Sequence, residues 1–455
     1  MIAALNLQQV RELTGGELQG GNPHFNAVST DTRSLHPGQL FIALTGPNFD
    51  GNGFIADAAA AGACAALVSR PQQQDAPLPT LQVADTRIAL GQLGAHNRRC
   101  STARVVALTG SQGKTSVKEM TAAILAQCGP VLSTHGNLNN DLGVPLTLLQ
   151  IDAEHHFAVI ELGANAGGEI AYTAALTQPD VAHITNVAPT HLQGFGSLQG
   201  VAAGKAELWQ GLVPGGTAVL NLDDELVVAG FSAGAAVRRI GISASGKAEA
   251  DYALDHYDDA GIAGGTCQLR TPQGQVSIQL VLPGRHNAAN ALAATALAME
   301  AGADLQQVVA GLSTMRPVKG RMQVRRGRRG ASVIDDSYNA SPASFHAALL
   351  VLARQPGLRI VVAGDMGELG NAAEAQHAAI GHLARELGIE RFIGVGPLSR
   401  FAVEEFGATG QHVADRAAAV TLVEPLLDIG VCILVKGSRS ASMEHVVDKL
   451  VEQED

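Results

Sequence analysis

Charged and aromatic residues are scarce in this chain. Of its 455 residues, 16% are charged and 4% are aromatic, against 46% that are hydrophobic. The 42 acidic residues outnumber the 31 lysines and arginines, so the formal net charge is −11 and no nucleic-acid partner is expected. No run approaches the ~20 apolar residues of a membrane-spanning helix, so no membrane span is expected. The length predicts roughly two to four domains with separate cores.

Cysteine is also rare. The five cysteines are scattered, odd in number and without C-x-x-C spacing; they are Cys64, Cys100, Cys128, Cys267 and Cys432. This pattern argues against a disulfide framework or a structural zinc site and predicts a reducing, cytoplasmic location. Residues 1–8 have no basic start and no long apolar core, so no signal peptide is expected.

Glycine is abundant, with 52 residues, and its most informative cluster is Gly110-Ser111-Gln112-Gly113-Lys114-Thr115-Ser116. An apolar run at 105–108 precedes it and an expected helix at 117–125 follows, which is the context of a phosphate-binding loop. Glycines let backbone N–H groups converge on an anion, and the helix turns its positive end toward it. Lys114 would then reach the β- and γ-phosphates, and the Thr115 hydroxyl would ligate Mg²⁺.

The loop is shorter than the common G-x-x-x-x-G-K-[ST] form, because Leu108 stands at the position of the first glycine. The alternative interpretation is a glycine turn with a surface lysine. The strand before the loop and the helix after it favour the phosphate loop. The chain is therefore expected to consume a nucleoside triphosphate.

Three regions follow one another along the chain. The pattern of residues 1–99 predicts a smaller α/β domain with a helix near 55–61. Residues 100–314 predict a largely parallel, P-loop-type sheet with helices on both faces, closed by a long helix at 288–301. Residues 315–455 repeat the α/β alternation and predict a Rossmann-like domain. Strands are expected at 39–44, 105–108, 157–160, 181–185, 217–220, 331–334, 359–363, 391–395 and 431–435, and a surface loop is expected at 71–77.

Polar residues after the strands of the second region could bind metal or phosphate. Glu161 ends a strand and could face the Thr115 hydroxyl, since Mg²⁺ accepts one or two protein carboxylates together with phosphate oxygens and water. His191 lies in the loop after another strand. Taken singly, an ordinary strand-terminal acid and a surface histidine are the alternatives.

Lys205 lies in the segment 201–207, which is interpreted as a helix start with mostly apolar neighbours. Partial burial would lower the pKa of this amine. A neutral amine can capture CO₂ as a carbamate, which supplies an anionic oxygen for a metal. A solvated helix lysine is the alternative.

Two segments of the third region also follow strands. Residues 335–339 are acidic, and residues 436–440 place two cations beside small hydroxyls, which suits phosphate or carboxylate. A charged strand-to-helix loop is the alternative. The basic run of Arg325, Arg326, Arg328 and Arg329 is most simply a solvated turn, with phosphate binding as the alternative.

Together these segments resemble the Mur ligase family of ATP-dependent amide-forming ligases, over essentially the whole chain. The segments that carry the resemblance are GSQGKTS at 110–116, GNLNND at 136–141, ELGAN at 161–165, THL at 190–192, GRHNAAN at 284–290, DDSYNA at 335–340, GDMGEL at 364–369 and KGSRS at 436–440. DDSYNA and KGSRS point to the member that joins D-alanyl-D-alanine to UDP-MurNAc-tripeptide, because related ligases tend to carry a Tyr-Ala-His-type motif in place of the former.

The resemblance implies three domains and a division of labour. The N-terminal domain would bind the UDP-sugar, the central domain ATP and Mg²⁺, and the C-terminal domain would close over the site and help bind the incoming dipeptide. No partner chain is implied, so a monomer is expected.

The resemblance also implies residue roles. Lys114, His191 and carbamylated Lys205 would be catalytic, and Thr115, Glu161, His191 and Lys205 would surround magnesium. The nucleotide would contact residues 110–116, Asn287, Arg321, Asp336 and Lys436. Gln112 is a loop position that family members vary, so it has no separate role. The substrates would contact Ser29, Asp31, Arg33, Asn137, Asn140, Tyr338 and Asn339.

Two other hypotheses stay open on sequence alone. A folylpolyglutamate-synthase-like ligase would share the architecture, although DDSYNA weighs against it. A regulatory nucleotide-binding protein without catalysis would have little use for Lys114, Glu161 and Lys205 together.

Overall fold

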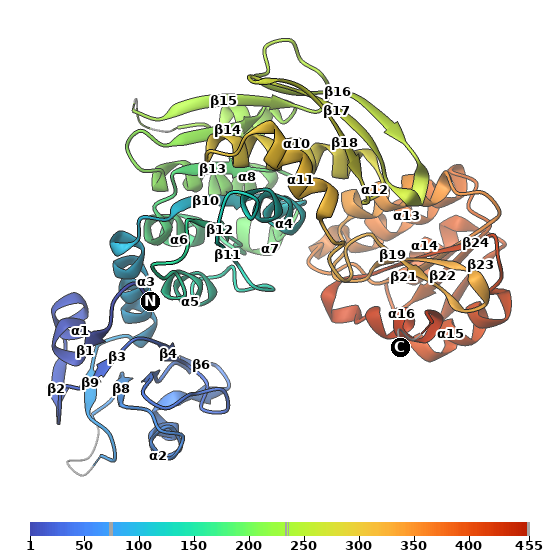
Figure 1. The fold of residues 1–455 in the computed structure, drawn as a ribbon. Helices are drawn as coiled ribbons and strands as arrows, with labels where there is room; N and C mark the ends of the chain where they lie inside the picture. The colour runs from blue at the N-terminus through green and yellow to red at the C-terminus, as the bar shows by residue number, and fades with distance from the viewer. Residues whose placement is uncertain (72–75, 233, 235, 453–455) are drawn as a thin grey trace.

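Three α/β domains follow one another in the computed structural model, which describes residues 1–71, 76–232, 234 and 236–452. The N-terminal domain, blue in Figure 1, and the orange-to-red C-terminal domain lie at opposite ends of the central domain. The predicted α/β fold class is confirmed, with sheets of five, nine and six strands in the three domains. Residues 72–75 of the expected loop lie outside the described residues. Within the described residues no helix is long and apolar enough to span a membrane.

The N-terminal sheet has five strands and is parallel except for its edge strand β2. Its order is β2 (Glu17–Gln19), β9 (Thr80–Gln82), β8 (Ala65–Val68), β5 (Leu40–Ile42) and β4 (Val28–Ser29). Its helices are α1 (Leu7–Thr14), α2 (Ile55–Ala60) and α3 (Thr86–Cys100), and short pairs form from β1 (Leu5–Asn6) with β3 (His24–Phe25) and from β6 (Thr45–Gly46) with β7 (Phe49–Asp50). The helix expected near 55–61 is α2, and α3 also packs on two helices of the central domain, α5 (Gly143–Leu149) and α6 (Glu169–Thr177).

The central sheet is parallel through its first seven strands and ends in an antiparallel extension. Its order is β11 (Val131–Ser133), β12 (Phe157–Glu161), β10 (Arg104–Thr109), β13 (Val181–Ile184), β14 (Thr217–Asn221), β15 (Arg238–Ser243), β16 (Tyr252–Asp259), β17 (Gly265–Thr271) and β18 (Gly274–Leu280). Its helices are α4 (Lys114–Leu125), α5 (Gly143–Leu149), α6 (Glu169–Thr177), α7 (Leu192–Phe195), α8 (Leu198–Ala206), α9 (Glu225–Ala229), α10 (Arg285–Glu300) and α11 (Leu305–Thr314).

Helices cover both faces of the central sheet, as expected for strands that are apolar on both sides. Along β10, Val106 and Leu108 join the core beneath α4 and α10, while Val105 and Ala107 join the core beneath α5 and α6. Successive strand side chains point to opposite faces, so a strand buried on both sides must be apolar throughout. Each fully buried Val or Leu contributes roughly 1.5–3 kcal/mol. The helix expected at 288–301 is α10, whose alanines allow close packing on the sheet.

Two expectations for this domain were wrong in part. The sequence did not predict β15 or the strands β16 to β18, although residues 276–280 alternate between more and less buried positions. Lys205 lies in the last turn of α8 and not at a helix start. The helix begins earlier because the Ser197 hydroxyl caps it by accepting from the Gly200 N–H at 3.0 Å.

The C-terminal sheet is parallel except for its edge strand β19. Its order is β19 (Gln323–Arg326), β20 (Ser332–Asp336), β24 (Val431–Lys436), β21 (Leu358–Gly364), β22 (Arg391–Val395) and β23 (Gly410–Val413). Its helices are α12 (Pro342–Ala353), α13 (Ala373–Glu386), α14 (Ser399–Phe406), α15 (Arg416–Val423) and α16 (Glu444–Leu450). The four strands expected in this region are β20, β21, β22 and β24.

Candidate functional site

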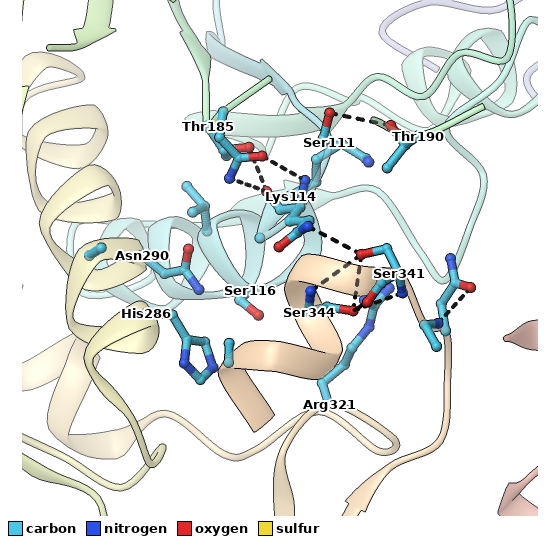
Figure 2. A pocket seen from close by; sticks show the side chains of 18 of the residues that line it. Ser111, Lys114, Ser116, Thr185, Thr190, His286, Asn290, Arg321, Ser341 and Ser344 are labelled. Atoms are coloured by element: carbon cyan, nitrogen blue, oxygen red, sulfur yellow. Dashed lines mark hydrogen bonds between the residues drawn. The ribbon is translucent and has the colours of Figure 1, made fainter. Parts of the chain in front are cut away.

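A cavity of about 820 Å³ lies between the central and C-terminal domains, at the carboxyl ends of their strands. Parallel α/β sheets bind ligands at this edge. The central domain contributes the phosphate loop, the residues after β13 and the start of α10, and the C-terminal domain contributes residues near α12 and after β21 and β24. In Figure 2 the start of α12, with Ser341 and Ser344, lies beside Lys114 and Ser116 of the loop.

The loop between β10 and α4 can only be built with its two glycines. Gly110 has φ +148°, and a Cβ there would lie 1.9 Å from the Thr185 hydroxyl. Gly113 has φ +76° and occupies the cap position of α4 in the left-handed region. Because glycine has no side chain, the chain can turn tightly here, and the first residues of α4 line the cavity. The start of a helix beside a cavity is the arrangement of an anion site.

Lys114 lies at the first position of α4 and lines the cavity. Its Nζ donates to the Gly110 carbonyl at 2.8 Å. Burial lowers the pKa of this amine, the Glu161 carboxylate opposes that shift and the Arg321 guanidinium adds to it. A triphosphate entering the cavity would supply the negative charge that favours the protonated amine.

Thr115 and Glu161 meet behind the loop, as the sequence predicted. The Thr115 hydroxyl donates to Oε2 of Glu161 at 3.0 Å, and Nδ2 of Asn139 donates to Oε1 at 2.8 Å. Glu161 is only 2% exposed, and its backbone N–H donates to the Thr134 hydroxyl at 2.9 Å. The pair presents a hydroxyl and a carboxylate, which are oxygen donors of the kind that Mg²⁺ accepts.

Lys205 is buried, with 2% of its surface exposed. Burial lowers its pKa to about 7, and the positive charge of Lys114 adds to the shift. A substantial fraction of this amine is therefore neutral near pH 7, which is the form that reacts with CO₂.

His191 faces the C-terminal domain. Its Nδ1 lies 2.6 Å from Oε2 of Glu368, which follows β21. Burial lowers the pKa of His191, and the Glu368 carboxylate opposes that shift. His191 has φ +51° and Glu368 has φ +63°, both in the left-handed region that non-glycine residues rarely adopt. Such backbone conformations are common at functional sites. His191 and Glu368 both adopt them and are in contact between two domains.

The predicted metal-binding set is only partly assembled. Thr115 and Glu161 are in contact, whereas His191 contacts Glu368. Over residues 1–71, 76–232, 234 and 236–452, no three or more His, Cys, Asp or Glu side chains are grouped so that they could hold a metal ion.

The C-terminal wall of the cavity is cationic and partly neutralised. Nζ of Lys436 lies 2.5 Å from Oδ2 of Asp336 and donates to the Asn339 carbonyl at 2.9 Å. Burial lowers the pKa of Lys436, and Asp336 opposes that shift. The Arg321 guanidinium lies 4.2 Å from the centre of the Tyr338 ring and donates to the Thr115 hydroxyl at 3.4 Å. Arg321, Asp336, Asn339 and Lys436 all line the cavity.

Gln112 connects the phosphate loop to the third domain. Its Nε2 donates to the Ser341 hydroxyl at 3.1 Å. Ser341 is the N-cap of α12, and its hydroxyl also accepts from the Ser344 N–H. Figure 2 shows Ser341 and Ser344 side by side at the start of α12. The positive end of α12 thus faces the proposed phosphate site.

The start of α10 forms another wall. Nδ2 of Asn287 donates to the Pro283 carbonyl at 2.8 Å, and Nδ2 of Asn290 donates to Oδ1 of Asn287 at 3.1 Å. His286 lies beside them, and burial lowers its pKa. In Figure 2, His286 and Asn290 lie on the side of the cavity away from Arg321, so this wall offers ring and amide nitrogens there.

Most of the residues expected to bind the substrates lie apart from the cavity. In the N-terminal domain, the Ser29 hydroxyl donates to the Asp31 carbonyl at 2.9 Å, and Arg33 pairs with Asp31 at 2.6 Å, which lowers the pKa of Asp31 to about 2. Asn137 and Asn140 are exposed in the segment before α5. These five residues do not line the cavity between the domains.

Sequence reasoning assigned no role to five residues at the site: Asn139, which orients Glu161, and His286, Asn290, Ser341 and Glu368. All but Ser341 lie in motifs that carry the family resemblance, so the missing information was the direction of each side chain. The basic run at 325–329 lies outside the cavity, where Arg326 pairs with Glu452 and Arg328 with Glu424.

Three family models match successive parts of the chain. The Mur ligase family, catalytic domain, matches residues 24–98; the Mur ligase middle domain matches 108–298; and the Mur ligase, glutamate ligase domain, matches 320–439. Each match falls within one of the three domains described above.

Known proteins match over nearly the whole length. UDP-N-acetylmuramoyl-tripeptide–D-alanyl-D-alanine ligase of Escherichia coli (strain K12) is 48% identical over 451 residues, 99% of each chain. The crystal structure of MurF from Acinetobacter baumannii has a TM-score of 0.92 at 36% identity and covers 99% of this chain and 100% of that one. Folylpolyglutamate synthase from Mycobacterium tuberculosis is 18% identical, with a TM-score of 0.65 over 81% of this chain and 96% of its own, and shares the fold alone.

The three-domain fold, with a phosphate loop facing a cavity closed by the third domain, defines an ATP-dependent, amide-forming ligase. The matches extend over all three domains and over the whole length of the relatives. The chain belongs to the Mur ligase family.

Proposed function

We propose that this chain joins D-alanyl-D-alanine to UDP-MurNAc-tripeptide at the expense of ATP and so makes the UDP-MurNAc-pentapeptide precursor of peptidoglycan. The observation that carries the proposal is the 48% identity, over 99% of both chains, to a ligase whose name states these substrates. Residues of the DDSYNA and KGSRS segments line the C-terminal wall of the cavity, where the dipeptide would enter.

The three domains divide the reaction between them. Residues 1–99 hold the UDP-sugar, with Ser29, Asp31 and Arg33 at its uridine–phosphate end. Residues 100–314 bind ATP, and residues 315–455 close over the site and bind the dipeptide with Tyr338 and Asn339. Asn137 and Asn140 lie in the segment that approaches the tripeptide.

The first chemical step is phosphorylation of the tripeptide carboxylate. A carboxylate oxygen attacks the γ-phosphorus of ATP, the bond to the β-phosphate oxygen breaks, and ADP leaves an acyl phosphate behind. Anions must approach each other, so positive groups held in place before the reaction stabilise the transition state. Lys114, Arg321 and the first turn of α12 supply them, while Asn287 and His286 contact the base.

Magnesium would assist this phosphorylation step. Thr115 and Glu161 fit it, because a hydroxyl and a buried carboxylate lie 3.0 Å apart behind the phosphate loop. His191 and carbamylated Lys205 complete the proposed set. Bound there, the ion would neutralise charge on the phosphate oxygens.

The second step forms the amide. The deprotonated amine of D-alanyl-D-alanine attacks the acyl carbon, a tetrahedral intermediate forms, and the carbon–oxygen bond to phosphate breaks. Water would hydrolyse the acyl phosphate, so the C-terminal domain must exclude it. The His191–Glu368 and Gln112–Ser341 contacts join that domain to the central one.

The proposed setting is the cytoplasm and the proposed state is a monomer. The five cysteines are free in the structure, and free thiols are usual in a reducing compartment. Cell fractionation tests the location, and analytical ultracentrifugation tests the oligomeric state.

One assay tests the function. Phosphate release from ATP is measured with UDP-MurNAc-tripeptide, with and without D-alanyl-D-alanine, and with either diaminopimelate or lysine as the third residue of the peptide. We expect release that depends on the dipeptide with one of the two peptides. Release with folate and glutamate instead would favour the folylpolyglutamate-synthase alternative, and ATP binding without any turnover would favour a regulatory protein.

A further inference from the structure

One buried charge in the central domain has no part in the chemistry described above. Lys118, in the second turn of α4, is 1% exposed. Its Nζ donates to the Thr134 carbonyl at 2.6 Å and pairs with the Glu119 carboxylate at 2.7 Å. Burying an amine is costly unless its donors are satisfied, so an apolar side chain would be the less expensive choice at this position.

The position of Lys118 on α4 connects it to the phosphate loop. It lies four residues after Lys114 and three after Thr115, so the three side chains share one side of the helix. That side packs against β11 and β12, which lie beside α4 in Figure 1. Lys118 reaches the residue that directly follows β11.

Thr134, the partner of Lys118, holds the backbone of Glu161. Its N–H donates to the Val159 carbonyl at 3.0 Å, which continues the β11–β12 ladder by one step. Its hydroxyl accepts from the Glu161 N–H at 2.9 Å. Its carbonyl then turns out of the sheet, where the amine of Lys118 satisfies it.

The segment that begins at Thr134 also holds the Glu161 carboxylate. Asn139 donates through Nδ2 to Oε1 at 2.8 Å, and its carbonyl accepts from the Gly163 N–H at 2.7 Å. Thus one segment, fixed to α4 by Lys118 at its start, orients both the backbone and one carboxylate oxygen of Glu161. Thr115, from the first turn of α4, holds the other oxygen.

We propose that Lys118 is a positioning residue: it fixes the 134–139 segment to α4 and thereby holds Glu161 opposite Thr115 for magnesium. This inference rests on the proposed function of Glu161. Lys118 does not line the cavity, so its loss should act on magnesium-dependent binding and leave the phosphate loop intact. Partners that orient metal ligands typically contribute about 10- to 100-fold in metal affinity or activity.

The test is calorimetric titration of the full chain with a non-hydrolysable ATP analogue, with and without Mg²⁺. For Lys118→Met we expect magnesium-dependent affinity to fall by about tenfold, while affinity without magnesium is unchanged. The matched control is Arg98→Met. Arg98 is another buried cation that donates to a backbone carbonyl, that of Thr177 at 3.0 Å, far along the chain from this segment. The Arg98→Met variant should leave the affinity for the analogue unchanged both with and without Mg²⁺.

A second variant covers the case in which Lys118→Met shows no cooperative thermal unfolding. Thr134→Val removes the hydroxyl that accepts from Glu161 and keeps Lys118, and it should produce the same selective loss. In the double variant the two losses should be less than multiplicative, because they act through one segment.

An unchanged magnesium-dependent affinity in these variants, or an equal fall with and without magnesium, overturns the inference. An unaltered chain that binds the analogue equally with and without Mg²⁺ overturns the magnesium site and this inference with it. An unaltered chain with magnesium-dependent binding but no dipeptide-dependent phosphate release overturns the proposed function alone.

Discussion

At the scale of single residues, burial and neighbouring charge decide the chemistry of the site. Lys114 and Lys205 are both buried, and the charge of Lys114 helps to lower the pKa of Lys205. Glu161 keeps its carboxylate oriented by accepting from Thr115 and Asn139. We therefore propose different tasks for the two lysines: Lys114 would meet phosphate as a cation, and Lys205 would react as a neutral amine.

The first residue-scale prediction concerns Lys205 and pH. Its pKa is lowered to about 7, so the neutral amine is a minority below that pH and the majority above it. Carbamate formation adds CO₂ to the neutral amine and releases a proton, so its occupancy should rise between pH 6 and pH 8, a window set by the ~1-unit spread of a single titration. Carbon-13 NMR of the chain in labelled bicarbonate measures this directly.

The control is Lys205→Ala, which should lose the carbamate signal and lose activity, with partial rescue by a small carboxylic acid. Full activity of this variant without the added acid would rule the carbamate out.

The second residue-scale prediction concerns Lys114→Ala. This variant removes the positive group that we propose lies beside the γ-phosphate, so kcat should fall by about 10²–10³-fold, as for other single donors to a developing anion. Steady-state phosphate release measures kcat, and thermal unfolding checks that the fold is intact. Near-normal turnover would mean that the loop does not act on phosphate.

At the scale of elements, the loop from β10 to α4 and the start of α12 face each other across the cavity. The loop depends on backbone that only glycine allows, and α12 depends on its Ser341 cap. Both helices begin at the carboxyl edge of a parallel sheet, so the positive N-terminal end of each faces the cavity.

Gly110→Ala tests the loop. With φ +148° and a new Cβ 1.9 Å from the Thr185 hydroxyl, the loop must change its path, so we expect loss of ATP binding by calorimetry. Gly53→Ala is the matched control, because its Cβ would meet nothing within 4 Å. If Gly110→Ala bound ATP as well as the Gly53→Ala control does, the assignment of the phosphate loop would fail.

Gln112→Ala tests the bridge to α12. The variant loses one hydrogen bond to Ser341, and such a bond contributes about 0.5–1.5 kcal/mol, so the affinity for an ATP analogue should fall roughly 2- to 10-fold. Thermal stability should change little, because Gln112 is only partly buried in the cavity wall. An unchanged affinity would mean that this bridge does not couple the two domains.

At the scale of the whole molecule, the three-domain α/β plan could be predicted, because strands buried on both faces are apolar throughout and alternate with helices. The Thr115–Glu161 contact could also be predicted, since both residues follow neighbouring strands at one sheet edge. The antiparallel strands β16 to β18 were missed, because weakly alternating strands give a fainter signal than fully buried ones.

Contacts between distant segments could not be read from the sequence. The Glu368 partner of His191 and the Thr134 partner of Lys118 depend on how loops turn after their strands. The sequence shows where these residues lie along the chain, but loop paths decide the Lys118–Thr134 contact, and the packing of two domains decides the His191–Glu368 contact.

The central claim is that ATP activates the tripeptide carboxylate as an acyl phosphate, which the dipeptide amine then attacks. UDP-MurNAc-tripeptide labelled with ¹⁸O in its reacting carboxylate tests this directly, with mass spectrometry of the products after turnover with ATP and D-alanyl-D-alanine. The account predicts one ¹⁸O in each inorganic phosphate and one retained in the new amide of the pentapeptide. Unlabelled phosphate alongside pentapeptide, or label in AMP, would contradict it.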